Sequence, residues 1–99
     1  MYGTVARAFL KPDGVADAAA GLLQAGVGTA PGQIAVYVYQ MDQNPREIRI
    51  VALFESEAAY RQNAASPEQA ARFAQVMTLL EREPEWHDGH VIYQNTPGL

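Results

Sequence analysis

Residues 34–54 read IAVYVYQMDQNPREIRIVALF, which is two apolar segments separated by a short polar one. Residues 34–39 and 47–54 are rich in β-branched and aromatic side chains, which favour strands. Between them, residues 42–45 are Asp-Gln-Asn-Pro, a composition typical of turns. This stretch therefore predicts a β-hairpin, and the hairpin is the centre of the predicted fold.

The segments on both sides of the hairpin alternate between strand and helix patterns. They are residues 3–10 (strand), 15–23 (helix), 56–63 and 67–83 (a helix broken at Ala65-Ser66) and 90–94 (strand). The resulting order, βαββαβ, predicts an α+β domain with a ferredoxin-like fold. In this fold a four-stranded antiparallel sheet carries its helices on one face.

Local signals place the ends of the helices after the hairpin. Ser56 is a suitable N-cap for the first of them. Ser66, Pro67 and Gln69 form a capping-box pattern with proline at the first helical position. Proline cannot continue helical hydrogen bonding, so Pro84 is predicted to end the second helix. The pair Asp88-Gly89 predicts a turn or bulge before the last strand.

Composition indicates one globular domain. The chain has 99 residues, of which 48 % are hydrophobic. This length matches a single domain covering residues 1–99, and this apolar content is ordinary for a folded protein. A domain of this size buries a modest share of its surface, and a partner surface would stabilise it further.

Charge and cysteine content exclude several classes of function. The net charge is −4, and the seven Lys and Arg residues are scattered along the chain. Nucleic acids and anionic membranes need a basic patch, so neither is expected as a partner. There is no cysteine, which rules out disulfides and thiolate chemistry. No membrane-spanning run or signal-peptide pattern is present, and a cytoplasmic location is expected.

Both faces of the predicted hairpin are apolar. Ile34, Val36 and Val38 alternate with Tyr37 and Tyr39, so the side chains on both faces of this predicted strand are largely apolar. An antiparallel sheet with one face in water should alternate cleanly. An apolar second face on a soluble protein marks an interface. The sequence therefore predicts a homodimer in which two sheets pack face to face.

Two segments carry a resemblance to a known family. Residues 54–61, FESEAAYR, and residues 84–89, PEWHDG, resemble the small antibiotic-biosynthesis-monooxygenase-like proteins of the dimeric α/β-barrel superfamily. The resemblance implies a dimeric barrel with a pocket between sheet and helices in each protomer. Members of the superfamily include cofactor-free oxygenases of aromatic compounds and haem-degrading enzymes. The chain departs from the haem-degrading pattern, because its first strand offers Arg7 and no asparagine.

Two functions follow from the resemblance. In the first, the protein is a cofactor-independent monooxygenase that oxidises a planar aromatic substrate without metal or flavin. In the second, it is a non-catalytic dimeric module that binds a small apolar molecule or acts in a stress response. Fold alone does not decide between them.

The enzyme hypothesis assigns roles to residues with suitable chemistry. The predicted catalytic residues are Asn63, Trp86 and His87, and the predicted substrate-binding residues are Arg7, Tyr37, Tyr60, Phe73 and Met77. An amide can stabilise an enolate, an indole can stack on a planar ligand and an imidazole titrates near neutral pH. Tyr60 and Asn63 are three residues apart, a spacing that puts them on one face of a helix.

Each of these residues also has a purely structural interpretation. Trp86 can pack against the last helix, and Asn63 can end its own helix. Arg7 can belong to an ion pair at the dimer interface. His87 can be an ordinary solvated histidine, and its spacing from His90 suits no metal on a strand or turn without a third ligand. No metal and no cofactor are therefore expected.

Overall fold

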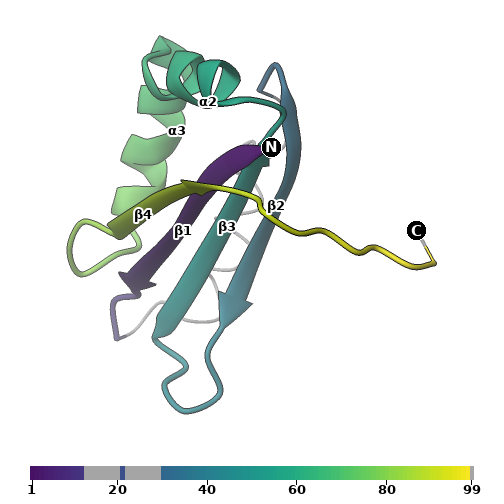
Figure 1. Ribbon diagram of the computed structural model, residues 1–99. Helices are drawn as coiled ribbons and strands as arrows, with labels where there is room; N and C mark the ends of the chain where they lie inside the picture. Colours follow the sequence, from purple (N-terminus) through teal and green to yellow (C-terminus); the bar gives the residue numbers. More distant parts are fainter. Residues whose placement is uncertain (13–20, 22–29, 99) are drawn as a thin grey trace.

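The computed structural model describes residues 1–12, 21 and 30–98. Its elements, in chain order, are β1 (Tyr2–Phe9), β2 (Gln33–Gln40), β3 (Glu47–Phe54), α2 (Glu57–Ala64), α3 (Pro67–Met77) and β4 (Glu85–His90) (Figure 1). The helix predicted over residues 15–23 lies outside the described residues, apart from Gly21. The other elements confirm the predicted α+β order.

The four strands form one antiparallel sheet in the order β2-β3-β1-β4. The hairpin partners β2 and β3 pair as predicted, with a register shift between Gln33 and Ala35. The first strand, β1, lies between β3 and β4 and pairs with both. This is the strand order of a ferredoxin-like sheet, in which the first strand is central.

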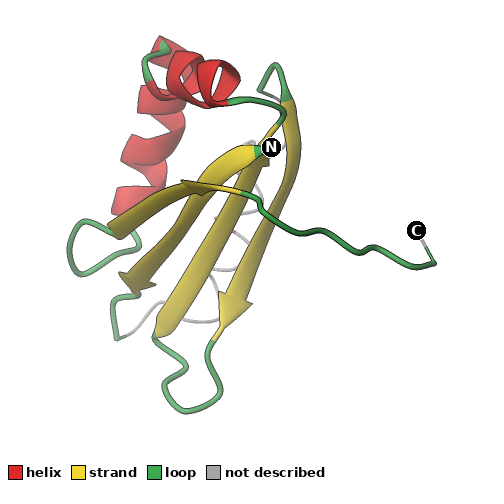
Figure 2. Ribbon diagram, viewed as in Figure 1, coloured by secondary structure: helices red, strands yellow, loops and turns green. Residues whose placement is uncertain are grey.

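Helices α2 and α3 pack against one face of this sheet, called here the inner face (Figure 2). Both begin where the sequence predicts. The Ser56 side chain accepts a hydrogen bond from the backbone of Ala59, and the Ser66 side chain accepts one from Gln69. These caps satisfy backbone donors that have no partner within a helix.

The structure moves two predicted boundaries. Helix α3 ends at Met77 and not at Pro84, because the chain after it bonds to the end of β1: the Leu79 carbonyl accepts from Lys11, and Glu81 donates to the Phe9 carbonyl. The last strand spans Glu85–His90 and not 90–94. The register explains this shift, because Tyr2 begins β1 and pairs with His90, which leaves later residues without a neighbouring strand.

The hydrophobic core lies between the inner face and the segment after α3. Its buried members are small on β1 and larger elsewhere: Ala6, Ala8, Leu10, Ile48, Phe54 and Leu80. Four of them, Ala8, Leu10, Ile48 and Leu80, form a cluster against which Ile50, Val76, Met77 and Leu79 pack. Alanine at two successive inward positions of the central strand lets the opposing side chains approach the sheet closely.

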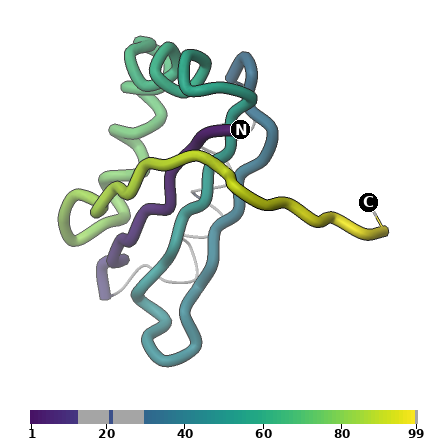
Figure 3. The backbone as a smooth tube through the Cα atoms, viewed as in Figure 1, coloured from purple at the N-terminus to yellow at the C-terminus, as the bar shows by residue number. Residues whose placement is uncertain are grey.

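The opposite face of the sheet, called here the outer face, carries exposed apolar side chains. Val5 is 48 % exposed, and Tyr37, which lies on the same face through its pairing with Val51, is 51 % exposed. Beyond β4 the chain extends away from the sheet (Figure 3). Ile92 and Tyr93, in this extension, are largely exposed.

Gly3 allows a close approach between β1 and β3. A Cβ atom at Gly3 would overlap the backbone carbonyl of Ala52, and strand β3 would have to move. We expect Gly3→Ala to lower the free energy of unfolding by about 2 kcal/mol or more, the range of overpacking in a rigid interior. Chemical denaturation of the purified protein measures this loss.

Gly89 provides a matched control, because it pairs with Gly3 across β1 and β4. A Cβ atom at Gly89 meets nothing within 4 Å. Gly89→Ala should therefore leave the stability within about 0.5 kcal/mol of the original, as surface substitutions do. Equal losses for the two variants would contradict the close approach at Gly3.

Candidate functional site

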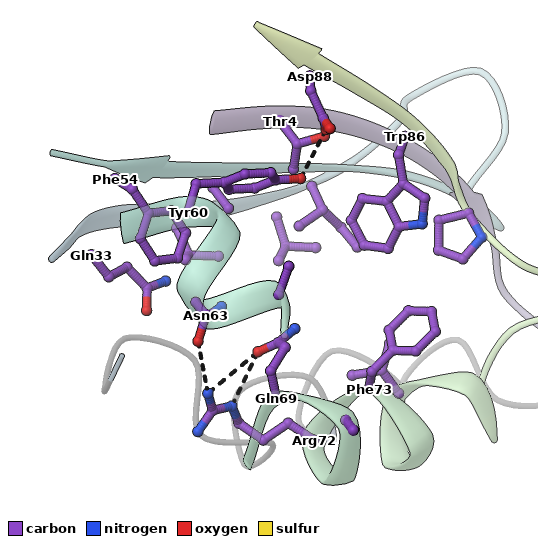
Figure 4. Close-up of a pocket in the computed structure, with 18 residues that line it drawn as sticks. Thr4, Gln33, Phe54, Tyr60, Asn63, Gln69, Arg72, Phe73, Trp86 and Asp88 are labelled. Carbon is purple, nitrogen blue, oxygen red and sulfur yellow. Dashed lines mark hydrogen bonds between the residues drawn. The ribbon is translucent and has the colours of Figure 1, made fainter. Parts of the chain in front are cut away.

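A cavity of about 570 Å³ lies between the inner face and helices α2 and α3 (Figure 4). Its floor is formed by apolar strand residues, namely Val36, Val38, Ile50, Ala52 and Phe54. Phe73 and Val76 of α3 cover it from the helix side. A largely apolar cavity with a few polar groups is the usual form of a small-molecule site.

The strand register brings the floor residues together in two rows. In one row, Thr4 of β1 lies between Ala52 of β3 and Asp88 of β4. In the next inward row, Ala6 lies between Ile50 and Trp86. Because side chains alternate along a strand, both rows point to the helices. The methyl group of Ala6 leaves space beside the indole of Trp86.

Aromatic side chains from two elements form one wall. The rings of Trp86 and Phe73 have their centroids 5.7 Å apart and are tilted by 48°. Trp86 keeps 46 % of its surface exposed, although it lines the cavity. A wall of this kind offers a planar ligand a surface to stack on.

A cluster of polar groups lies at the sheet side of the cavity. The Tyr60 hydroxyl donates a 2.8 Å hydrogen bond to Asp88 Oδ1, and Arg61 donates a 3.3 Å hydrogen bond to Asp88 Oδ2. The Thr4 hydroxyl is buried beside them and makes no hydrogen bond of regular geometry to the described residues. The hydrogen bonds to Asp88 tie α2 to β4.

The cluster controls the ionisation of its members. Burial raises the pKa of Tyr60 to about 12, and the hydrogen bond to Asp88 adds to this effect. Burial alone would raise the pKa of Asp88, but the Tyr60 and Thr4 hydroxyls and the Arg61 charge outweigh it and lower that pKa. At neutral pH the cavity therefore contains a neutral phenol beside an ionised carboxylate.

A second polar group lies on the helix side. Arg72 donates to Asn63 Oδ1 at 3.4 Å and to Gln69 Oε1 at 3.3 Å. In Figure 4 the Asn63 oxygen points toward Arg72. Because both amide oxygens accept from Arg72, the amide nitrogens of Asn63 and Gln69 remain as donors for a ligand, beside the Arg72 guanidinium, which also lines the cavity.

The structure brings four of the predicted site residues to the cavity and places four elsewhere. Asn63, Trp86, Tyr60 and Phe73 line it. His87, Arg7 and Tyr37 belong to the outer face, and Met77 packs against the core. The alternation of side chains along a strand explains His87, because its neighbours Trp86 and Asp88 both point inward.

Arg7 has its own partners on the outer face. Its Nε atom lies 3.1 Å from Glu47 Oε2, and its Nη1 atom lies 3.8 Å from Glu85 Oε2. Glu47 also binds Arg49 at 2.6 Å. Arg7 therefore belongs to an ion-pair network within one chain. Its guanidinium lies away from the cavity.

Sequence reasoning missed five polar residues that line the cavity: Thr4, Gln33, Gln69, Arg72 and Asp88. Asp88 had a usable signal, since a strand through residues 85–90 with Trp86 facing inward also turns Asp88 inward. The prediction of a turn or bulge at Asp88-Gly89 interrupts the strand pattern, so the inward position of Asp88 did not follow from the sequence. Arg72 and Gln69 carry no distinctive pattern, because charged and amide residues are common on exposed helix faces.

Two kinds of site are not found in the described part of the chain. Residues 1–12, 21 and 30–98 contain no group of three His, Asp or Glu side chains arranged to hold a metal ion. They also contain no helix that is long and apolar enough to cross a bilayer.

The sequence profile of the antibiotic biosynthesis monooxygenases matches residues 1–75. The chain belongs to this family. The match covers β1 to most of α3, the elements that form most of the cavity. No protein of curated function matches the sequence significantly.

Solved structures of the family share this fold. A protein from Chloroflexus aurantiacus J-10-fl, named as a candidate antibiotic biosynthesis monooxygenase, is 21 % identical over 98 % of each chain, with a TM-score of 0.79. A mutant of SnoaB, a cofactor-independent oxygenase from Streptomyces nogalater, is 14 % identical over 97 % of this chain and 96 % of its own, with a TM-score of 0.80. At these identities the likeness establishes the ferredoxin-like fold.

The raised pKa of Tyr60 has a measurable consequence for stability. A tyrosine ionises near pH 10 when unfolded, so between pH 10 and 12 the native state retains a proton that the unfolded state has lost. The free energy of unfolding must then fall as the pH rises. From pH 9 to pH 11 we expect this protein to lose about 1 kcal/mol more than Tyr60→Phe does.

Urea denaturation of the two proteins at matched pH values measures this difference. The other titrating groups are present in both proteins, so their contributions cancel in the comparison. Parallel stability curves would contradict the buried, hydrogen-bonded state of the Tyr60 phenol.

Proposed function

We propose that the protein is a cofactor-independent monooxygenase that oxidises a planar aromatic substrate, and that it works as a homodimer. One observation carries the proposal: the cavity combines the Trp86–Phe73 wall with the amide of Asn63, whose oxygen is occupied by Arg72. Membership in the monooxygenase family supports the same conclusion.

The geometry suits a substrate that supplies its own electrons to dioxygen. An anthrone stacks on the wall formed by Trp86 and Phe73, with its carbonyl oxygen at the Asn63 amide nitrogen. A hydrogen bond there stabilises the enolate that forms when the ring carbon loses a proton. The enolate carbon then reacts with dioxygen, one oxygen atom stays on the carbon to form the quinone, and the other leaves as water with the two ring hydrogens.

A binding module without catalysis is the second candidate. The observation that favours it is the position of His87 on the outer face, because no imidazole then faces the cavity among the described residues. In this case the same cavity holds a planar apolar molecule, and the polar groups only orient it.

Turnover separates the two candidates. Incubation with an anthrone under air should consume one dioxygen per quinone formed, above the uncatalysed background. Asn63→Ala should reduce kcat about 100-fold, because removal of one donor to a developing oxyanion has an effect of this size. Oxygen uptake and absorbance of the quinone measure both quantities.

Gln62→Ala is the matched control for Asn63→Ala. Gln62 is the preceding residue of α2, carries the same amide and is exposed outside the cavity. Its removal should leave kcat unchanged. Binding of the anthrone without turnover would contradict the enzyme proposal and support the binding module.

The homodimer is proposed from the outer face, where Val5, Tyr37 and Tyr39 are about half exposed. Two such faces packed together would bury these side chains. Tyr37→Asp would place a charge inside the interface, which is strongly unfavourable without a partner charge. Light scattering at micromolar concentration should show a dimer for the original protein and a monomer for Tyr37→Asp.

Ala74→Asp provides the control, because it adds the same charge at an exposed position of α3. This variant should remain a dimer. A stable monomer of the unaltered protein would contradict the proposed interface.

A further inference from the structure

The sheet side of the cavity presents hydrogen-bond acceptors to a ligand. Asp88 Oδ1 accepts from Tyr60 and Oδ2 accepts from Arg61, yet an ionised carboxylate has about four acceptor positions. The Tyr60 hydroxyl donates its only proton to Asp88, so its oxygen can only accept from other groups. A ligand that reaches this Asp88 corner, at the sheet side of the cavity, therefore finds hydrogen-bond acceptors there.

Thr4 lies beside Asp88 in the sheet and can donate a hydrogen bond to it. The residue is 4 % exposed, and its hydroxyl oxygen is buried without a regular hydrogen bond to the described residues. Of the groups nearby, the ionised Asp88 carboxylate is the strongest acceptor for its proton. With its hydroxyl hydrogen turned to Asp88, Thr4 helps to hold the carboxylate in place, while the buried Thr4 oxygen stays out of reach of a ligand.

The helix side presents the opposite chemistry. There the amide oxygens of Asn63 and Gln69 accept from Arg72, and the amide nitrogens remain as donors. Figure 4 shows this group and the Asp88 corner on opposite sides of the cavity. A ligand that satisfies both sides has an acceptor oxygen at one edge and a hydrogen-bond donor at the other.

The negative charge of Asp88 disfavours negatively charged ligand groups at the Asp88 corner. The Asp88 side chain is 27 % exposed and lines the cavity, whereas Arg61, its cationic partner, does not. Arg61 also pairs with Glu57 at 3.5 Å. Arg72, the cation that lines the cavity, lies on the opposite side (Figure 4). A negatively charged group at this edge of a ligand would therefore face the Asp88 carboxylate, and Arg61, already paired with Asp88 and Glu57, is not part of the lining.

We propose that Asp88, held in place by Tyr60 and Thr4, determines specificity by accepting a hydrogen bond from a neutral hydroxyl or amine at the edge of the aromatic ligand and by rejecting carboxylates there. The inference rests on the proposed aromatic ligand. It specifies which group the ligand must carry at one edge and how the ligand is oriented in the cavity. The carbonyl edge faces Asn63, and the donor edge faces Asp88.

Three anthraquinones that differ at one position test this selectivity. They carry a methyl, a hydroxymethyl or a carboxylate group at carbon 2, and the single tryptophan, Trp86, reports their binding by fluorescence. For the unaltered protein we expect the hydroxymethyl compound to bind about 10-fold more tightly than the methyl compound, as a hydrogen bond to a charged acceptor allows. The carboxylate should bind at least about 10-fold more weakly than the methyl compound.

Asp88→Asn keeps the shape of the side chain and replaces one acceptor by a donor. The variant retains an oxygen for the Tyr60 hydroxyl, so the link between α2 and β4 persists. The order of affinities should change: the hydroxymethyl advantage falls to about 2-fold or less, and the carboxylate binds about 10-fold more tightly than before. Loss of structure alone would weaken all three ligands and cannot produce this reversal.

Glu85→Gln is the matched control, because Glu85 lies on β4 and faces outward toward Arg7. The same change of charge there should leave all three affinities as they were. Equal binding of the three ligands to the unaltered protein would overturn the inference while leaving the aromatic site in place. If none of the ligands changes the Trp86 signal, the proposed aromatic site is wrong, and the role of Asp88 falls with it.

Discussion

The pairing of β1 with both β3 and β4 is the constraint on which the rest of the structure depends. Its register decides which side chains share the inner face, and it places Thr4 between Ala52 and Asp88. A shift of one residue would turn every one of these side chains to the other face. Gly3 allows the close approach of β1 to β3, and the small side chains of Ala6 and Ala8 let the core and the cavity reach the sheet.

Helix α2 connects the two chemically different sides of the cavity. Tyr60 and Asn63 lie one helical turn apart, so a single short helix presents a phenol to the sheet side and an amide to α3. The helix is fixed by Ser56 at its start and by the contacts of Tyr60 and Arg61 with Asp88. The same contacts that hold α2 in place therefore set the polarity of the cavity.

The two faces of the sheet serve different purposes. The inner face forms the floor of a cavity, and the outer face combines exposed apolar side chains with the Arg7, Glu47 and Arg49 ion pairs. Tyr37 and Val36 are neighbours in the chain, yet one belongs to the proposed partner surface and the other to the cavity.

The sequence by itself determined the order of the described elements, the helix starts at Ser56 and Ser66 and the ferredoxin-like class, because these depend on local backbone preferences and apolar spacing. It also indicated Asn63, Tyr60, Phe73 and Trp86, which all line the cavity. The extent of β4, the end of α3 and the inward position of Asp88 came only from the tertiary structure. The length of β4 and the direction of its side chains are set by hydrogen bonds to β1, some eighty residues away in the chain. The sequence of one segment does not specify the register in which it pairs with a distant strand.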